Sequence, residues 1–229
     1  MVTPELLSTF PVLKPLPHDI LSQLAALTSL RKFARRGVVM KAGVQEDCVC
    51  FLFEGRLQGV DFTIDGREVG LYFVEPGDFC GEVGLFDNGP QPEFVIALTA
   101  AVTVMVPMAS LRSVMLTHPH LFRVMTERLA ARLRQMTRQR SLLGLPDISQ
   151  RVCCQLWMLV KDAQGEPVII QNPPTHMEIA IMLNLSRETV TRVFQALQTR
   201  QIVRRDGAGT LLINDPNALR ELARGGQSL

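Results

Sequence analysis

No histidine lies between His18 and His118, although most of the short apolar runs of the chain fall in that stretch. Metal-dependent enzymes on a small β-barrel, such as the cupins, hold their metal with several inward-facing histidines and carboxylates. We therefore expect no enzyme activity and no metal cofactor, and a cupin-like enzyme is the weaker alternative of a different class. His118 and His120 flank a proline, which fits a polar turn as well as a metal or haem ligand pair.

Cysteine is also scarce, with five residues, no CxxC spacing and none among residues 1–47. An iron–sulfur cluster needs a group of cysteines, so the absence of cysteine from residues 1–47 disfavours an iron–sulfur sensor there. Cys48 and Cys50 would share one face of a strand, where small buried cysteines are ordinary core residues. A reduced, cytoplasmic protein is expected, and a redox role for a cysteine is the alternative.

Long apolar runs are missing as well. The longest uncharged run lies between Phe94 and Arg112, and it contains Pro107 together with Thr99, Thr103 and Ser110. It therefore favours strands over a spanning helix. Residues 1–10 have no basic segment followed by an apolar one, so we expect no secretion signal and no membrane partner. With 229 residues, 47% of them hydrophobic, the chain can fold into one large domain or two small ones.

Acidic and basic side chains are concentrated in different parts of the chain. Residues 46–93 are rich in acidic side chains, and Arg56 and Arg67 are the only basic residues among them. Residues 123–140 hold six arginines and one acid, and residues 187–205 hold five arginines and one acid. This asymmetry suggests a sensing module joined to a module that binds a polyanion.

Short apolar runs separated by glycine-containing turns fill residues 38–107 and predict many short strands. Asp65-Gly66 is the strongest hairpin signal, because a tight type I′ turn needs positive φ. Regularly spaced short strands of this kind favour a jelly roll or a small barrel. The expected strands are Val38–Met40, Cys48–Phe53, Val69–Val74, Phe94–Leu98 and Ala101–Val106.

A helical period follows Pro107. Apolar residues recur every seven positions, Leu133 lies on the same side of the helix, and Thr126 and Arg140 fall between them. This pattern predicts a helix from Leu121 to Leu143 that pairs with a second copy of itself. A helix packed only on its own β domain is the alternative. Gly144 and Pro146 end the helix. The predicted dimer interface is Phe122, Leu129, Leu133, Met136 and Leu143.

The last eighty or so residues alternate between helix and short strand. A helix over 148–160 and a strand over 167–171 come first. Thr175 and Glu178 fit a capping box that opens a helix ending at Leu183. Ser186 caps a second helix, Arg187 to Thr199, and a hairpin over 202–213 with its turn at 206–209 follows. Two short helices joined by a tight turn and followed by a hairpin indicate a winged helix-turn-helix.

Two of these segments resemble one known family. Ile179 to Val193 is similar to the helix-turn-helix of the Crp/Fnr superfamily, and Pro76 to Phe86 is similar to its cyclic-nucleotide-binding signature. The resemblance implies an α+β fold: an effector-sensing β jelly roll in residues 1–118, a dimerisation helix and hinge in 119–145 and a winged helix-turn-helix in 146–229. It further implies a homodimeric, effector-controlled transcription regulator whose partners are double-stranded DNA and RNA polymerase.

The second helix of the pair carries the groups that read bases. Arginine can donate two hydrogen bonds to guanine and glutamate can accept one from cytosine, and Arg187, Glu188 and Arg192 offer this set. The resemblance implies a TGTGA-like half-site within a pseudo-palindrome. A solvated face of charged residues is the alternative. With Ser186 at the cap, the expected phosphate contacts are Thr189, Thr191, Arg200, Arg204 and Arg205.

The resemblance also implies an effector site, in which this chain departs from relatives that bind cyclic AMP. Gly81 and Glu82 match the pair that contacts ribose and phosphate. Pro92-Glu93 stands where an Arg-Ser pair neutralises the phosphate, and Met136-Thr137 where a Thr-Ser pair reads adenine. Loss of the arginine removes a bidentate clamp, so we expect a small-molecule effector other than cyclic AMP. Arg67 or Arg132 could replace the lost cation.

Other interpretations of this site stay open. The pocket could have lost ligand binding, which would leave a constitutive or redox-responsive regulator of the same family. A regulatory subunit without DNA binding is disfavoured by the helix-turn-helix. The candidate effector residues are Gly81, Glu82, Pro92, Glu93, Arg132, Met136 and Thr137.

Overall fold

The computed structural model describes residues 2–160, 167–207 and 209–226. The chain forms two compact units, Met1–Met136 and Thr137–Leu229, which we describe separately. The long helix α5 (Pro119–Leu143) gives its first turns to the N-terminal unit and its last turns to the C-terminal unit. None of the helices within the described ranges is long and apolar enough to span a bilayer.

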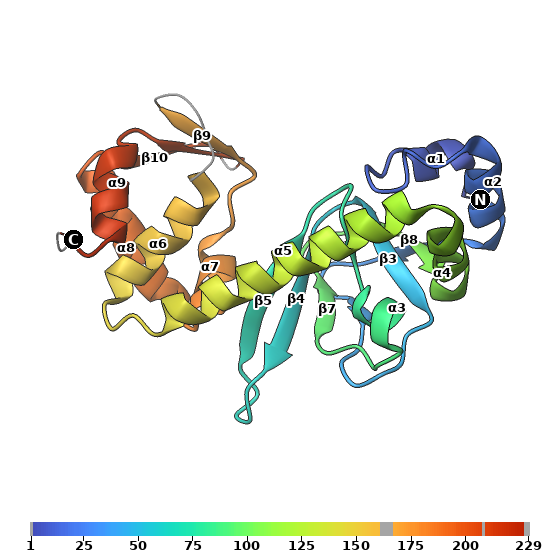
Figure 1. Ribbon diagram of the computed structural model, residues 1–229. Helices are drawn as coiled ribbons and strands as arrows, with labels where there is room; N and C mark the ends of the chain where they lie inside the picture. The colour runs from blue at the N-terminus through green and yellow to red at the C-terminus, as the bar shows by residue number, and fades with distance from the viewer. Residues whose placement is uncertain (1, 161–166, 208, 227–229) are drawn as a thin grey trace. The chain divides into compact units, whose positions relative to one another are not determined.

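Two four-stranded antiparallel sheets form the N-terminal unit (Figure 1). Their inner faces enclose an apolar core that includes Leu52, Leu57, Val74 and Met105. This arrangement confirms the predicted jelly-roll type of fold. One sheet has the order β1 (Ser29–Phe33), β8 (Ala101–Pro107), β3 (Cys48–Glu54) and β6 (Phe79–Cys80); the other has β2 (Val38–Met40), β7 (Phe94–Ala97), β4 (Leu57–Phe62) and β5 (Glu68–Val74).

Three of these strands were not predicted, and each lacks a sequence signal for a physical reason. The side chains of β1 are mostly exposed and polar, and β6 has only two residues. In β4 the apolar run is interrupted by Gly59, which lies opposite Tyr72. A glycine is needed there because a Cβ would come within 2.5 Å of the tyrosine ring. The predicted turn at Asp65-Gly66 joins β4 to β5, and Gly66 has a φ of 79°.

Helices cover the outer face of the first sheet and bury a second apolar core. Phe51 and Phe79 of the sheet face Phe10, Leu111 and Leu121 in this core. The N-terminal helices gave no clear helical period in the sequence, since they are short and separated by prolines. The helices of this unit, besides the start of α5, are α1 (Pro4–Ser8), α2 (His18–Leu27), α3 (Val83–Asp87) and α4 (Met108–Thr117).

Helix α5 has two different faces. Leu121 and Met125 are fully buried against the N-terminal unit. The side chains predicted for a dimer interface lie elsewhere on the helix, and Phe122 is 50% exposed and Leu133 66% exposed. Met136 and Leu143 are exposed as well, and Leu129 is half-buried. The predicted helix, Leu121 to Leu143, is confirmed and begins two residues earlier, at Pro119.

The C-terminal unit packs helices around a three-stranded antiparallel sheet of order β10, β11 and β9. Leu156, Leu183, Phe194 and Ile213 lie in its core. Ala208, in the predicted turn between the last two strands, lies outside the described residues. The elements are α6 (Ile148–Val160), β9 (Val168–Gln171), α7 (His176–Leu183), α8 (Arg187–Thr199), β10 (Val203–Asp206), β11 (Thr210–Ile213) and α9 (Pro216–Ala223).

Local hydrogen bonds set the ends of α7 and α8 as predicted. Thr175 and Glu178 form a full capping box at the start of α7. Asn184 ends that helix in the left-handed conformation, with a φ of 51°. The Ser186 hydroxyl accepts from the backbone N–H of Thr189 at 3.1 Å and caps α8. The helix-turn-helix is therefore confirmed.

Candidate nucleic-acid interface and sensor site

One face of α8 belongs to the core and the other presents charge to solvent. Val190, Phe194 and Leu197 are buried, which fixes the rotation of the helix. Arg187 and Glu188 are exposed in its first turn. Arg192 is exposed on the next turn, and it donates to the Thr189 hydroxyl at 3.3 Å. Side chains at the start of a second helix are those that meet base edges in a major groove.

Two hydroxyls expected to contact phosphates bond within the helix pair. Thr189 Oγ1 lies 2.9 Å from the Ser186 hydroxyl. Thr191 Oγ1 donates to the carbonyl oxygen of Arg187 at 2.9 Å, and it lies 3.0 Å from Nδ1 of His176. The structure therefore gives Thr191 an internal role that its spacing in the sequence did not indicate.

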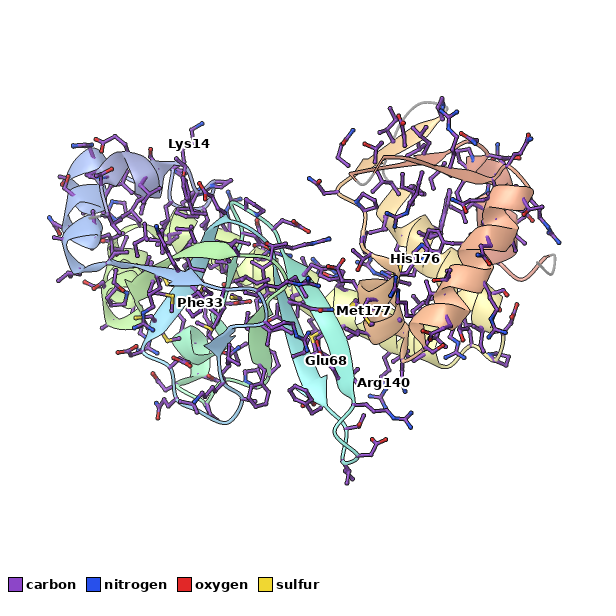
Figure 2. The ribbon with its side chains drawn as sticks, turned by 180° about the vertical axis from the view of Figure 1, so that it is seen from behind. Lys14, Phe33, Glu68, Arg140, His176 and Met177 are labelled. Atoms are coloured by element: carbon purple, nitrogen blue, oxygen red, sulfur yellow. The ribbon has the colours of Figure 1, made fainter. Side chains whose placement is uncertain are left out.

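His176, at the start of α7, was not predicted to take part in this surface (Figure 2). Its ring packs on Phe194 of α8 with 4.3 Å between the ring centroids. Burial, followed by the charges of Arg205 and Arg187, lowers the pKa of His176 from its ordinary 6.5. A histidine in the first turn of a helix is a weak sequence signal, because its partners come from the next helix.

The basic side chains after α8 lie beside a polar hollow. Arg200 and Arg204 are exposed, whereas Arg205 is half-buried. The hollow has a volume of about 400 Å³. Arginines in such a setting can contact a phosphate backbone without reading bases. The residues that line the hollow are Gln198, Gln201, Val203, Arg204, Arg205 and Asn214.

In the N-terminal unit, a guanidinium from α5 reaches a buried carboxylate. Arg132 Nη1 donates to the two oxygens of Glu82 at 2.7 and 3.0 Å, and Nη2 donates to the carbonyl of Phe79 at 2.9 Å. Glu82 is fully buried and Arg132 is 5% exposed. Gly81 precedes Glu82 with a φ of 80°, and a Cβ there would come within 2.3 Å of Met40.

A second carboxylate lies in the same site. Glu93 accepts hydrogen bonds from the Tyr72 hydroxyl and from Gln91 Nε2, the latter at 3.0 Å. The Arg132 guanidinium lies 4.1 Å from the centroid of the Tyr72 ring, so Tyr72 joins the two carboxylates into one network. Burial raises the pKa of Glu93 and of Glu82, and Arg132 acts against this shift in both.

The expected effector residues are only partly brought together. Glu82, Glu93 and Arg132 share the network with Tyr72 and Gln91, which the sequence analysis missed. Pro92 and Met136 are exposed, and Thr137 belongs to the C-terminal unit. Arg67 pairs with Asp65 at 2.8 Å on the exposed β4–β5 hairpin, so of the two candidate cations the structure assigns Arg132 to this site. The signal for Tyr72 was that the chain's single tyrosine falls in an apolar strand, where its hydroxyl needs a partner.

A second arginine of α5 makes a parallel contact one turn earlier. Arg128 Nε donates to Asp78 at 2.9 Å, and its Nη2 contacts the other carboxylate oxygen. Asp78 and Glu82 lie on either side of β6, and their partners Arg128 and Arg132 lie one turn apart on α5. The pair of contacts fastens α5 to the site.

The cysteines and histidines form no comparable site. Cys50 and Cys80 face each other across β3 and β6 and are fully buried. Their mutual hydrogen bond, together with burial, raises the pKa of Cys80, and burial raises that of Cys48 to about 11. Thiols in such surroundings are unreactive. Within the part of the chain that the structure describes, no three histidine, cysteine or acidic side chains are placed to hold a metal ion.

Comparisons with known proteins match both units. A family model of the cyclic nucleotide-binding domain matches residues 30–118, and one of the Crp-like helix-turn-helix domain matches residues 150–222. The chain is 29% identical over 209 residues to the CRP-like cAMP-activated global transcriptional regulator of Mycobacterium tuberculosis, covering 89% of this chain and 93% of that protein.

Two further relatives support the same likeness. The cAMP-activated global transcriptional regulator CRP of Pasteurella multocida is 27% identical over 181 residues, which cover 78% of this chain and 87% of that protein. The structure of FixK2 from Bradyrhizobium japonicum has the same fold, with a TM-score of 0.73 at 21% identity over 85% of this chain and 96% of that one.

Proposed function

Because this chain belongs to the Crp/Fnr family of DNA-binding transcription regulators, we propose that it acts as a homodimer, reads a pseudo-palindromic DNA site and is controlled by a small molecule other than cyclic AMP. The observation that carries the proposal is the orientation of α8. Its apolar face is locked in the core, so Arg187, Glu188 and Arg192 are presented together to solvent.

In this proposal the three solvent-facing side chains of α8 read bases and the others position the protein. Arginine and glutamate supply the hydrogen-bond pattern of a G·C-containing half-site. Arg200, Arg204 and Arg205 contact phosphates, and the capped N-terminus of α8 adds a favourable dipole. The hydroxyls of Ser186, Thr189 and Thr191 form hydrogen bonds inside the helix pair. In this proposal they also contact the DNA backbone at the edge of the interface.

Dimerisation is proposed to use the exposed apolar stripe of α5. The helix already buries Leu121 and Met125 in its own unit. Phe122 contacts Phe86 of that unit with 6.0 Å between the ring centroids but stays 50% exposed, and Leu133 stays 66% exposed. A second copy of the helix would remove these side chains from water, and each Å² of apolar surface buried in this way is favourable by roughly 25 cal/mol. Two copies related by a twofold axis also match the symmetry of a pseudo-palindrome.

The effector is proposed to bind at the network of Glu82, Arg132, Tyr72 and Glu93. The two relatives named above are, by their names, activated by cyclic AMP. Here the guanidinium is already paired with Glu82, and Glu93 adds a buried carboxylate. A cyclic phosphodiester would meet a like charge there with no cation left to offset it. We therefore assign this site to an uncharged or cationic small molecule.

We further propose a division of labour along the chain. Residues 1–118 sense the effector, residues 119–145 dimerise and residues 146–229 bind DNA. RNA polymerase is the proposed protein partner of the DNA-bound dimer.

Sequence selection from a random duplex pool tests the proposal. We expect the full chain to enrich a dyad-symmetric motif with half-sites about one helical turn apart. Arg187→Ala should lose ~1–3 kcal/mol of DNA-binding free energy and relax the preference for guanine at one position. Arg204→Ala should weaken binding to all sequences alike and reduce the salt slope by about one. Arg224→Ala, an exposed arginine at the end of α9, is the control. Recovery of no symmetric motif would overturn the proposal.

A further inference from the structure

One buried amide near the end of α5 bonds to the carboxyl end of α7. Gln139 is 6% exposed, although Arg138 and Arg140 on either side of it are exposed. Its Nε2 donates to the carbonyl oxygen of Met182 at 2.6 Å. Both residues belong to the C-terminal unit, in which the last turns of α5 lie beside α7 (Figure 1). A buried amide needs such a partner, because an unpaired polar group away from water is costly.

The Met182 carbonyl is one that α7 cannot satisfy by itself. An α-helix leaves the carbonyls of its last turn without an intrahelical donor, and α7 ends one residue after Met182. Asn184 then turns the chain in the left-handed conformation, and the N–H of Leu185 donates to the Ala180 carbonyl at 2.9 Å. Met182 is 2% exposed, so this helix end is shielded from solvent. Gln139 therefore supplies a donor at the turn of the helix-turn-helix.

The turn connects this contact to α8. Three residues separate α7 from α8, and the last of them, Ser186, caps α8 with its hydroxyl. The imidazole of His176 at the start of α7 lies 3.0 Å from the Thr191 hydroxyl of α8. The two helices are thus fastened to each other at the turn and along their length, and the bond from Gln139 fastens the pair to the end of α5.

We propose that Gln139 is a positioning residue that sets the spacing between the two half-sites of the DNA site. The inference rests on the proposed DNA binding and the proposed dimerisation through α5. In that dimer the two copies of α5 define the twofold axis, and each Gln139 fixes one helix-turn-helix relative to its own α5. Half-site spacing mirrors the separation of the two recognition helices. The Gln139 bond therefore contributes to reading the spacing, whereas Arg187 and its neighbours read bases.

A purely structural role for this amide has a different consequence. If the bond only stabilised the C-terminal unit, its loss would lower the affinity for every duplex alike, including one with a single half-site. If the bond positions the helix pair, its loss leaves each helix-turn-helix able to read its own half-site and relaxes only the relation between the two. Duplexes that differ only in spacing therefore separate the two roles.

The test measures the affinity of the full chain for three duplexes by fluorescence anisotropy: the selected symmetric site, the same site with one base pair inserted between its half-sites, and the site with one half-site scrambled. The insertion rotates one half-site by about a tenth of a turn, and in the wild type it should cost at least about tenfold in affinity. Gln139→Met has a similar length but no donor. In this variant the insertion should cost about threefold or less, and the affinity for the single half-site should stay within about twofold of the wild type.

Further variants control for the substitution itself. Gln139→Lys keeps a donor facing the carboxyl end of α7, where a cation is favoured, and should restore the wild-type sensitivity to the insertion. Ser141→Ala removes an exposed hydroxyl that donates to the Thr137 carbonyl within α5 at 3.2 Å, and it should keep that sensitivity. Circular dichroism and sedimentation establish that each variant is a folded dimer. If Gln139→Met is not, Gln139→Asn takes its place, because its shorter side chain withdraws the amide from the carbonyl.

Three results overturn this inference and leave the proposed function intact. They are a wild-type penalty for the insertion in Gln139→Met, an equal loss of affinity for all three duplexes in that variant, and a wild type that binds the inserted and selected sites equally. Failure of Gln139→Lys to restore the penalty overturns the role of the donor. Absence of any dyad-symmetric site for the wild type overturns the proposed function, and this inference with it.

Discussion

At the scale of single residues, the proposed choice of effector depends on Glu93. The carboxylate is 7% exposed and shares its hydrogen bonds with Tyr72 and Gln91. The family resemblance implies an Arg-Ser pair where this chain has Pro92-Glu93, so the expected cation is absent and a buried carboxylate is present at Glu93. A change of charge sign in a buried site decides the class of ligand more firmly than its shape does.

The raised pKa of Glu93 gives a prediction for stability. Burial makes the carboxyl hold its proton to a higher pH in the folded chain than in the unfolded one, so ionisation lowers stability as the pH rises through the folded pKa. Glu93→Gln cannot ionise. Relative to the wild type, its free energy of unfolding should therefore rise between pH 4.5 and 7.5, measured by denaturant titration at both pH values.

Glu127→Gln is the matched control for this titration, because its side chain is 63% exposed on α5. It should follow the wild type at both pH values. Parallel pH profiles for the wild type and Glu93→Gln would show that the carboxyl is not perturbed by burial.

The two arginines of α5 should differ in their contribution to stability. Arg132→Ala leaves Glu82 buried without its counter-charge, which costs about 3–5 kcal/mol. Arg128→Ala breaks a partly exposed pair with Asp78 and should cost about 1 kcal/mol or less. Denaturant unfolding followed by circular dichroism measures both. Equal losses in the two variants would contradict the assignment of Arg132 to a buried site.

At the scale of elements, we propose that α5 joins sensing to dimerisation, because one of its faces packs on the N-terminal unit and another is exposed. One face carries Leu121, Met125 and Arg132 into the N-terminal unit, and another leaves Phe122 and Leu133 exposed. We expect a charge at Leu133 to disturb the proposed interface more than the fold of the unit, because this side chain is 66% exposed in the single chain. This separation makes the proposed interface testable by single substitutions.

Leu133→Glu should convert the dimer to a monomer, because an unpaired charge in an apolar interface is costly. Sedimentation velocity at low micromolar concentration measures the change. Leu116→Glu, on α4 and 85% exposed in the chain alone, should remain dimeric. A dimeric Leu133→Glu with normal DNA binding would place the interface elsewhere.

The elements differ in how far the sequence predicts them. Helices α7 and α8 follow from local signals, since Thr175, Glu178 and Ser186 satisfy the free N–H groups at the helix starts through bonds to residues three positions away. The sensor network could not be predicted in the same way. Tyr72 and Glu93 are 21 residues apart, and Glu82 and Arg132 are 50 apart, so only the folded sheets bring them together.

At the scale of the whole molecule, helix α5 links the proposed sensing unit, in which residues 46–93 are rich in acidic side chains, to the proposed DNA-reading unit, in which residues 187–205 hold five arginines. The proposed symmetry of the dimer sets the symmetry of the DNA site, and the charge of the sensor site sets the class of effector.

The most direct test of the central claim is the affinity of the full chain for the selected symmetric duplex, compared with a duplex in which one half-site is scrambled, with and without cyclic AMP. Fluorescence anisotropy at one fixed salt concentration suffices. We predict that the intact duplex binds roughly a hundredfold or more tightly than the scrambled one and that millimolar cyclic AMP leaves both affinities unchanged. Equal affinity for the two duplexes, or strengthening of the intact site by cyclic AMP, would contradict it.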